Sequence, residues 1–251
     1  MIDLEQRVKL ALRAFDRRRR GDPELRWLPR LVAPGRPAVD IGANRGVYTY
    51  WLARCSERVH AFEPNPEVAR NLAAAGLRNV VVHELALSDA AGEGVLFLPH
   101  HPRGGMNDPA ATLEAGHLPG DGDPLRIRVA TACLDDIDMG AVGFIKIDVE
   151  GHEERVLDGG WATIARHRPA VLIELEEDKS EGCLGRVAAR FEAIGCRAQF
   201  LDGGRWHRLA ALREGQRGPS GRAINNFLMV PDERPAPAAA PGAVRIRGWV
   251  S

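Results

Sequence analysis

The sequence predicts an α/β fold with a mostly parallel, Rossmann-like sheet and helices on both of its faces. Short apolar runs that end in an acidic residue recur along the chain, and several are followed by apolar residues at helical spacing. The first of these runs, 38–41, opens into a turn that contains two glycines. In α/β proteins a glycine-rich turn between a strand and a helix is where nucleotide-like cofactors bind.

This first strand and turn have the sequence AVDIGANRG over residues 38–46. Gly42 and Gly46 allow positive φ and let a ligand approach the bare main chain. Helical spacing follows over 47–51. Asp40 stands at the end of the strand, so that a polar group faces the predicted ligand.

A second apolar strand, 59–63, ends in Glu63, about 20 residues further on. An acid at this place is suited to accept the two hydroxyls of a ribose. An ordinary strand and turn could contain either acid by chance, but the pair indicates an adenosine-containing cofactor.

The glycine pattern indicates which cofactor this is. A dinucleotide site has the pattern G-x-G-x-x-G, whereas Asn44 and Val47 stand here at the second and third glycine positions. A turn with no pyrophosphate cradle and an acid beside it fits a ligand with an ammonium group and no phosphate, such as S-adenosylmethionine. A nicotinamide-dependent oxidoreductase remains a disfavoured alternative.

Six motifs in order resemble the FkbM family of S-adenosylmethionine-dependent methyltransferases. They are DIGANRG at 40–46, FEPNP at 62–66, LALSD at 85–89, LDDI at 134–137, IKIDVEGHE at 145–153 and NNFLMVP at 225–231. The resemblance implies a class I methyltransferase fold, with a seven-stranded sheet whose last strand is reversed. It also implies O-methylation of a hydroxyl on a sugar or secondary metabolite, a small-molecule or glycan acceptor. A catalytically inactive interaction module is a further alternative, which the presence of Asp40, Glu63 and Asp148 disfavours.

For the cofactor, we expect Glu63 to accept the ribose hydroxyls, and Asp40 with the backbone at Gly42 to hold the methionine end. The main chain near Ala86, with Ser88 or Asp89, should border the adenine. The predicted cofactor-binding set is completed by Asn44, Gly46, Asn65 and Asp148.

For catalysis, we expect Asp148 to lie beside the transferring methyl group, with Glu150 near it. His152 is a candidate general base, or equally a histidine at a helix N-terminus tied to a carboxylate. Glu174, on the next strand, completes the predicted catalytic set. Hard oxygen ligands suit Mg²⁺, so Asp148, Glu150, Glu174 and Glu176 could instead hold a metal, but their spacing does not require one and no metal site is predicted.

Around this core, residues 1–35 are expected to form an N-terminal helix (2–20) and a proline-rich connector, and residues 36–231 the methyltransferase domain. Segment 93–130 reads as an inserted hairpin, with strands at 94–99 and 125–130 and a lid loop that includes His100 and His101. Helices are expected at 66–75, 153–157 and 184–194, with strands at 144–147, 170–176, 197–201 and 226–230. The stretch 232–251 is a Pro/Ala-rich tail.

Composition limits the partners. Lys plus Arg and Asp plus Glu each number 34, so nucleic acid is not expected as a partner, and Arg17–Arg20 fit the C-terminal end of a helix dipole. Four scattered cysteines argue against zinc and a disulfide framework. No stretch is long and apolar enough to span a membrane, and the amphipathic N-terminus is not a secretory signal. We therefore expect a cytoplasmic protein, with a possible homo-oligomer contact through the N-terminal helix.

Overall fold

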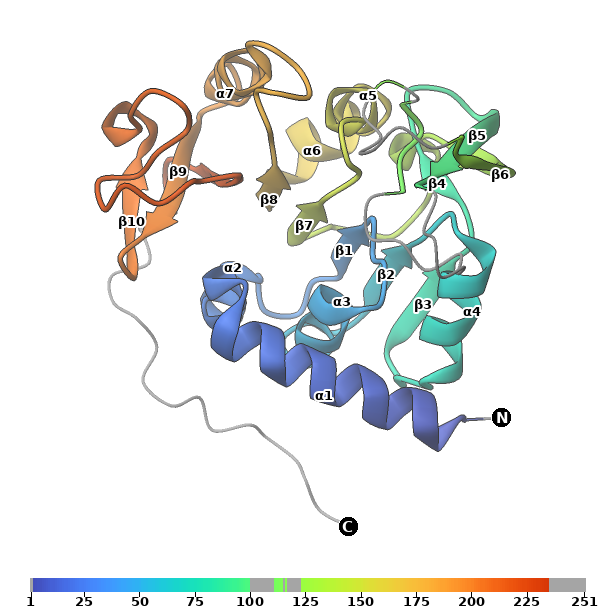
Figure 1. The fold of residues 1–251 in the computed structure, drawn as a ribbon. Helices are drawn as coiled ribbons and strands as arrows, with labels where there is room; N and C mark the ends of the chain where they lie inside the picture. The colour runs from blue at the N-terminus through green and yellow to red at the C-terminus, as the bar shows by residue number, and fades with distance from the viewer. Residues whose placement is uncertain (1, 100–110, 115, 117–122, 235–251) are drawn as a thin grey trace.

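A computed structural model describes residues 2–99, 111–114, 116 and 123–234. An eight-stranded sheet forms its centre, in the order β10-β9-β11-β8-β7-β1-β2-β3 (Figure 1). Its strands are β1 Ala38–Ile41, β2 Val59–Phe62, β3 Val80–His83, β7 Phe144–Ile147, β8 Ala170–Glu174, β9 Cys196–Asp202, β10 Arg205–Arg208 and β11 Asn226–Pro231. The helices are α1 Leu4–Arg20, α2 Leu28–Leu31, α3 Val47–Leu52, α4 Pro66–Ala74, α5 Glu153–Gly159, α6 Trp161–His167 and α7 Cys183–Glu192.

The strand directions confirm the predicted α/β class and correct the predicted strand count. Strands β3, β2, β1, β7 and β8 are parallel, and β11 runs antiparallel between β8 and β9, as expected for a reversed last strand. The expected seven strands are joined by an eighth, β10, which pairs with β9 across the turn at Gly203 and Gly204. It lies at the sheet edge and is polar, so it lacks the apolar run by which the other strands were predicted.

A second, three-stranded sheet lies beside α4 and α5 (Figure 1). Strands β5 Gly92–Leu98 and β6 Leu125–Ala132 form the predicted antiparallel pair. The two-residue strand β4, Ala86–Leu87, is too short to be predicted and pairs parallel with β6. His100 and His101 lie outside the described residues, as does most of the predicted lid loop.

Two apolar layers cover the large sheet. Helices α1 to α4 pack on one face, where Ala38, Phe144 and Leu172 point, and α5 to α7 pack on the other, where Val39 and Ile145 point. Alternate residues of each central strand therefore face opposite layers. Among the described residues, no helix has the length and apolar character needed to cross a bilayer.

Helix α1 buries only part of its apolar surface. Asp3 caps its N-terminus, and Leu10 and Ala14 are its buried residues. Leu4 and Leu12, two apolar residues of this amphipathic helix, are 72% and 67% exposed. They are exposed because the helix docks on α3 and α4 through other residues. A contact between this helix and a partner subunit stays a prediction.

Gly42 permits the closest main-chain approach in the sheet. Its φ is +74°, and a Cβ at this residue would lie 1.8 Å from the carbonyl oxygen of Asp148, just after β7. The turn after β1 and the segment after β7 therefore come together only because residue 42 has no side chain.

We expect Gly42→Ala to lower the free energy of unfolding by at least about 3 kcal/mol, from the left-handed backbone and the forced separation of these two segments. Gly35 is a matched control, since its φ is +67° but nothing lies within 4 Å of its added Cβ. Gly35→Ala should cost only about 1–2 kcal/mol. Urea unfolding of both variants measures the difference, and equal losses would show that the contact at Gly42 is not a constraint.

Candidate active site

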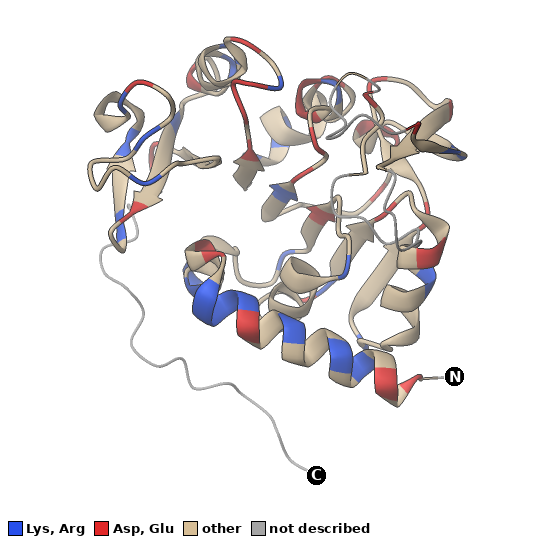
Figure 2. Cartoon of the chain, viewed as in Figure 1, with Lys and Arg blue, Asp and Glu red and all other residues tan. Residues whose placement is uncertain are grey.

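Parallel register brings four polar side chains to one edge of the sheet. Asp40 pairs directly with Lys146 of β7, and Lys146 pairs with Leu172 of β8. Asp148, directly after β7, and Glu174, the last residue of β8, each follow two residues later, so all four point to the face covered by α1 and α3. Figure 2 shows the acidic segments after β7 and β8 and the basic residues along α1.

Glu63 is held at the end of β2 by the main chain. Its two carboxylate oxygens accept hydrogen bonds from the backbone amides of Asn44 (2.7 Å) and Asn65 (2.9 Å). Burial raises the pKa of Glu63 to about 7, which these two hydrogen bonds partly offset. The carboxyl group therefore ionises near neutral pH, in a fixed orientation.

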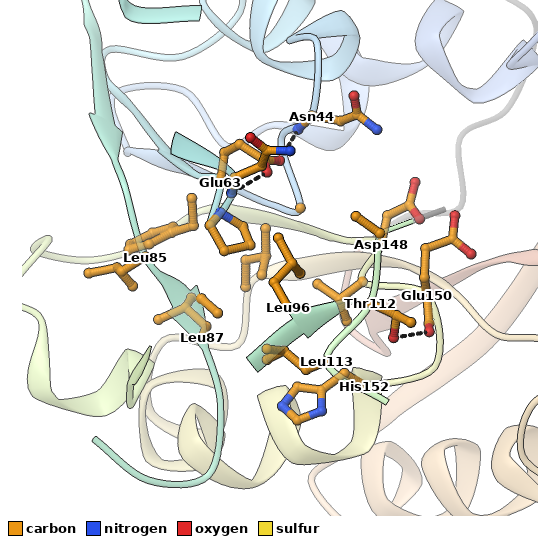
Figure 3. Close-up of a pocket in the computed structure, with 18 of the residues that line it drawn as sticks. Asn44, Glu63, Leu85, Leu87, Leu96, Thr112, Leu113, Asp148, Glu150 and His152 are labelled. Carbon is orange, nitrogen blue, oxygen red and sulfur yellow. Dashed lines mark hydrogen bonds between the residues drawn. The ribbon is translucent and has the colours of Figure 1, made fainter. Parts of the chain in front are cut away.

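A cavity beside Glu63 has an apolar end and a polar end (Figure 3). Leu85, Leu87 and Leu96 line the apolar end, and Asn44 and Asp148 stand across from them. The other lining residues are Ile41, Gly42, Phe62, Glu63, Pro64, Asn65, Val68, Ala86, Ala111, Thr112, Leu113, Val149, Glu150 and His152. An adenine ring fits apolar walls, and a ribose fits beside an oriented carboxylate.

Part of the inserted segment closes this cavity. The Thr112 hydroxyl donates to the Glu150 carbonyl (2.7 Å), and the ring of His152 donates from Nδ1 to Glu114 (2.8 Å). His152 Nε2 lies 2.9 Å from the Ser88 hydroxyl. Both ring nitrogens of this buried histidine are therefore engaged, one by Glu114 and the other by Ser88.

Asp148 and Glu174 form a carboxyl pair next to a buried ammonium group. The Lys146 Nζ lies 3.5 Å from Asp148 and donates to the Ile147 carbonyl. The charge of Asp148, followed by burial, raises the pKa of Glu174 to about 8. Near neutral pH Glu174 is therefore protonated while the side chain of Lys146, whose pKa the surrounding carboxylates raise, is charged.

A second ammonium group, that of Lys179, lies between two further acids. Lys179 forms ion pairs with both Glu150 and Glu176, and Glu150 has an unusual positive φ of 57°. Within the described part of the chain, no group of three or more His, Cys, Asp or Glu side chains is placed to hold a metal ion. Of the four acids considered as Mg²⁺ ligands, Asp148 pairs with Lys146, Glu150 and Glu176 pair with Lys179, and all four line one small cavity with Lys179.

A second cavity, of about 400 Å³, meets the first at Asp148. The two share Gly42, Asn44, Asp148 and Glu150. The second is also lined by Asp40, Lys146 and Glu174 and by residues from α1 and α3. Ligands in the two cavities would therefore meet beside Asp148 and Glu150.

Three of the predicted cofactor-binding residues have structural roles of their own. Asn65 caps α4 through its side chain, and Gly46 has a left-handed φ of +78°, a backbone conformation that favours glycine. Asp40 is fully buried and accepts a hydrogen bond from the Thr49 hydroxyl.

Sequence reasoning missed Lys146, Tyr48 and Thr112. A lysine inside the apolar run FIKID was a usable signal for Lys146, since a buried charge needs a partner. Tyr48 and Thr112 carried no such signal, because their contacts depend on how distant segments meet.

A doubly wound sheet with a reversed strand β11, and a cavity at the ends of β1 and β2, define the class I methyltransferase fold. A family model described as the methyltransferase FkbM domain matches residues 40–214. The chain therefore belongs to the FkbM methyltransferase family.

Individual relatives agree with this assignment. The 31-O-demethyl-FK506 methyltransferase FkbM of Streptomyces tacrolimicus is 29% identical over 222 residues, which is 72% of this chain and 82% of that protein. The crystal structure of methyltransferase FkbM from Methylobacillus flagellatus KT has the same fold, with a TM-score of 0.51 and 16% identity. That match covers 91% of this chain and 56% of the solved one.

The raised pKa of Glu174 predicts a pH-dependent stability. Its native carboxyl stays protonated up to about pH 8, whereas the unfolded one ionises near 4.5, so native stability falls as pH rises through this window. Between pH 5 and pH 8, wild type should lose about 2–4 kcal/mol of unfolding free energy relative to Glu174→Gln, whose side chain does not ionise. Parallel urea-derived stability curves for the two proteins would contradict the coupling to Asp148.

Proposed function

We propose that this chain is an S-adenosylmethionine-dependent O-methyltransferase. The observation that carries the proposal is the meeting of the two cavities at Asp148. The adenosine part of the cofactor fits the first cavity, because its apolar end suits a base, Glu63 suits the ribose hydroxyls, and no cradle for a pyrophosphate is present in the described turn. The methionine end reaches Gly42 and Asp40, which line the second cavity, and the acceptor occupies the rest of that cavity.

The residues around Asp148 supply alignment and proton transfer. When bound, S-adenosylmethionine provides a methyl group whose bond to sulfur breaks as its bond to the acceptor oxygen forms. The Asp148 carboxylate accepts the hydroxyl proton, and Glu174, already protonated, holds Asp148 by a hydrogen bond. The ammonium group of Lys146 limits the repulsion between these carboxyls and orients Asp148.

Asp148 is better placed for this role than His152. The imidazole is engaged by Ser88 and Glu114 and lies against the inserted segment, so we assign it to positioning residues 112–114 over the cofactor. Glu150 is fixed by Lys179 and contributes its carbonyl to the contact with Thr112.

The acceptor class follows from the family resemblance and one relative. The Streptomyces tacrolimicus protein is named for methylation of 31-O-demethyl-FK506, at an oxygen. We extend oxygen methylation to this chain, with a hydroxyl of a sugar or secondary metabolite as acceptor, because a carboxylate base suits a hydroxyl held beside it.

Glu63 should make cofactor affinity depend on pH. With a pKa of about 7, its carboxyl must ionise to accept the ribose hydroxyls most strongly, so binding of S-adenosylhomocysteine should tighten roughly tenfold from pH 6 to pH 8. Glu63→Ala should weaken binding by roughly ten- to a hundredfold at pH 8 and remove this dependence. Calorimetry tests both, with the exposed Glu84→Ala as control; unchanged affinity in Glu63→Ala would refute the assignment.

Asp148→Asn should reduce turnover by about 10²–10⁴ and leave cofactor affinity nearly intact, because only the proton acceptor is lost. The assay is transfer of a labelled methyl group to a pool of hydroxyl acceptors, with the exposed Asp158→Asn as control. Activity that disappears in EDTA and returns with Mg²⁺ would indicate a metal-held acceptor in place of a direct carboxylate base. Full turnover by Asp148→Asn would show that the catalytic centre lies elsewhere.

A further inference from the structure

The acceptor cavity contains a buried hydroxyl without a protein partner. Tyr48, on α3, is 9% exposed and lines the cavity, and its hydroxyl oxygen has no hydrogen-bond partner among the described residues. Burial, followed by nearby carboxylates, raises the pKa of Tyr48 well above its ordinary value. The group therefore stays a neutral phenol, and a buried phenol of this kind needs a polar partner, which a ligand atom in the cavity can supply.

At the outer end of the same cavity, a guanidinium group lacks a carboxylate partner. Arg13 of α1 forms no ion pair with a described Asp or Glu, and its hydrogen bond to the Arg45 carbonyl is 3.5 Å long. Partial burial and the charge of Arg45 both lower the pKa of Arg13. Its neighbour Arg17 differs, because Asp22 holds it through two hydrogen bonds.

Arg13 and Arg45 also line a third cavity, of about 430 Å³, between α1 and α4. Neither residue lines the cavity assigned to the adenosine part of the cofactor. The two arginines therefore line both the acceptor cavity and this third cavity. An anion placed there would gain charge-assisted hydrogen bonds from the Arg13 guanidinium.

We propose that the methyl acceptor carries an anionic group, a carboxylate or a phosphate, which binds at Arg13 and Arg45. The inference rests on the proposed function and narrows its substrate class. The reacting hydroxyl lies at Asp148, a polar atom of the acceptor partners the Tyr48 hydroxyl, and the anion reaches the outer end. The acceptor is then an acidic or phosphorylated hydroxyl compound, such as a uronic acid or a sugar phosphate.

The test uses the full chain saturated with S-adenosylhomocysteine, so that the carboxylate of the cofactor cannot account for the signal. D-Glucuronate, D-glucose 6-phosphate and D-glucose are titrated at constant ionic strength and followed by NMR. We expect one or both anionic probes to bind at least tenfold more tightly than glucose, with shifts at Arg13 and Arg45. The stronger of the two anionic probes identifies a carboxylate or a phosphate.

Variants locate the binding. Arg13→Gln should weaken binding of the anionic probe roughly tenfold, whereas Arg20→Gln, on the same helix and paired with Asp16, should not change it. Tyr48→Phe should weaken it about threefold or more and keep the preference for the anion.

Three results would overturn the proposal. The first is that glucose and both anions bind with equal affinity. The second is that Arg13→Gln binds the anionic probe as tightly as wild type does. The third is that Arg13→Gln loses tenfold in affinity for S-adenosylhomocysteine. The last result would assign Arg13 to the cofactor carboxylate and leave the proposed methyltransferase function intact. A protein that binds no S-adenosylhomocysteine at all would instead refute the proposed function itself.

Discussion

The site depends on one close contact, between the turn after β1 and the segment after β7. Gly42 and the carbonyl of Asp148 approach so closely that a single methyl group would separate them. Since β1 also pairs with β2 in register, this contact places Asp148, Asp40 and Glu63 together at the carboxyl ends of the parallel strands. Both cavities are lined by Gly42 and Asp148, the two residues of this contact, which explains why they meet there.

The second constraint is charge. Three carboxyl groups, Asp40, Asp148 and Glu174, lie near one lysine, Lys146. Asp40 and Lys146 are buried, whereas Asp148 and Glu174 are half-buried. Burial and mutual repulsion raise the pKa of Asp40 to about 6 and that of Glu174 to about 8, so the cluster is partly protonated near neutral pH. Because Glu174 is protonated near neutral pH, the cluster carries less negative charge than three ionised carboxyl groups would give it.

The sequence was sufficient for the elements whose pattern is local. The strands around Asp40, Glu63 and Asp148 were predictable because apolar runs of strand length end there in acids, and the cap at Asn65 because Asn-Pro begins a helix. Strand β10 and the outward apolar face of α1 were not, since the first has no apolar run and the second was decided by docking on α3 and α4. Tyr48 and Thr112 became visible only once α3 and the inserted segment were placed in three dimensions.

A crystal structure of the protein with S-adenosylhomocysteine tests the central claim most directly. Our account predicts that the ribose hydroxyls contact Glu63, that the adenine lies among Leu85, Leu87 and Leu96, and that the sulfur points toward Asp148 and the second cavity. A ligand bound away from Glu63, or a sulfur atom that faces away from Asp148, would contradict it.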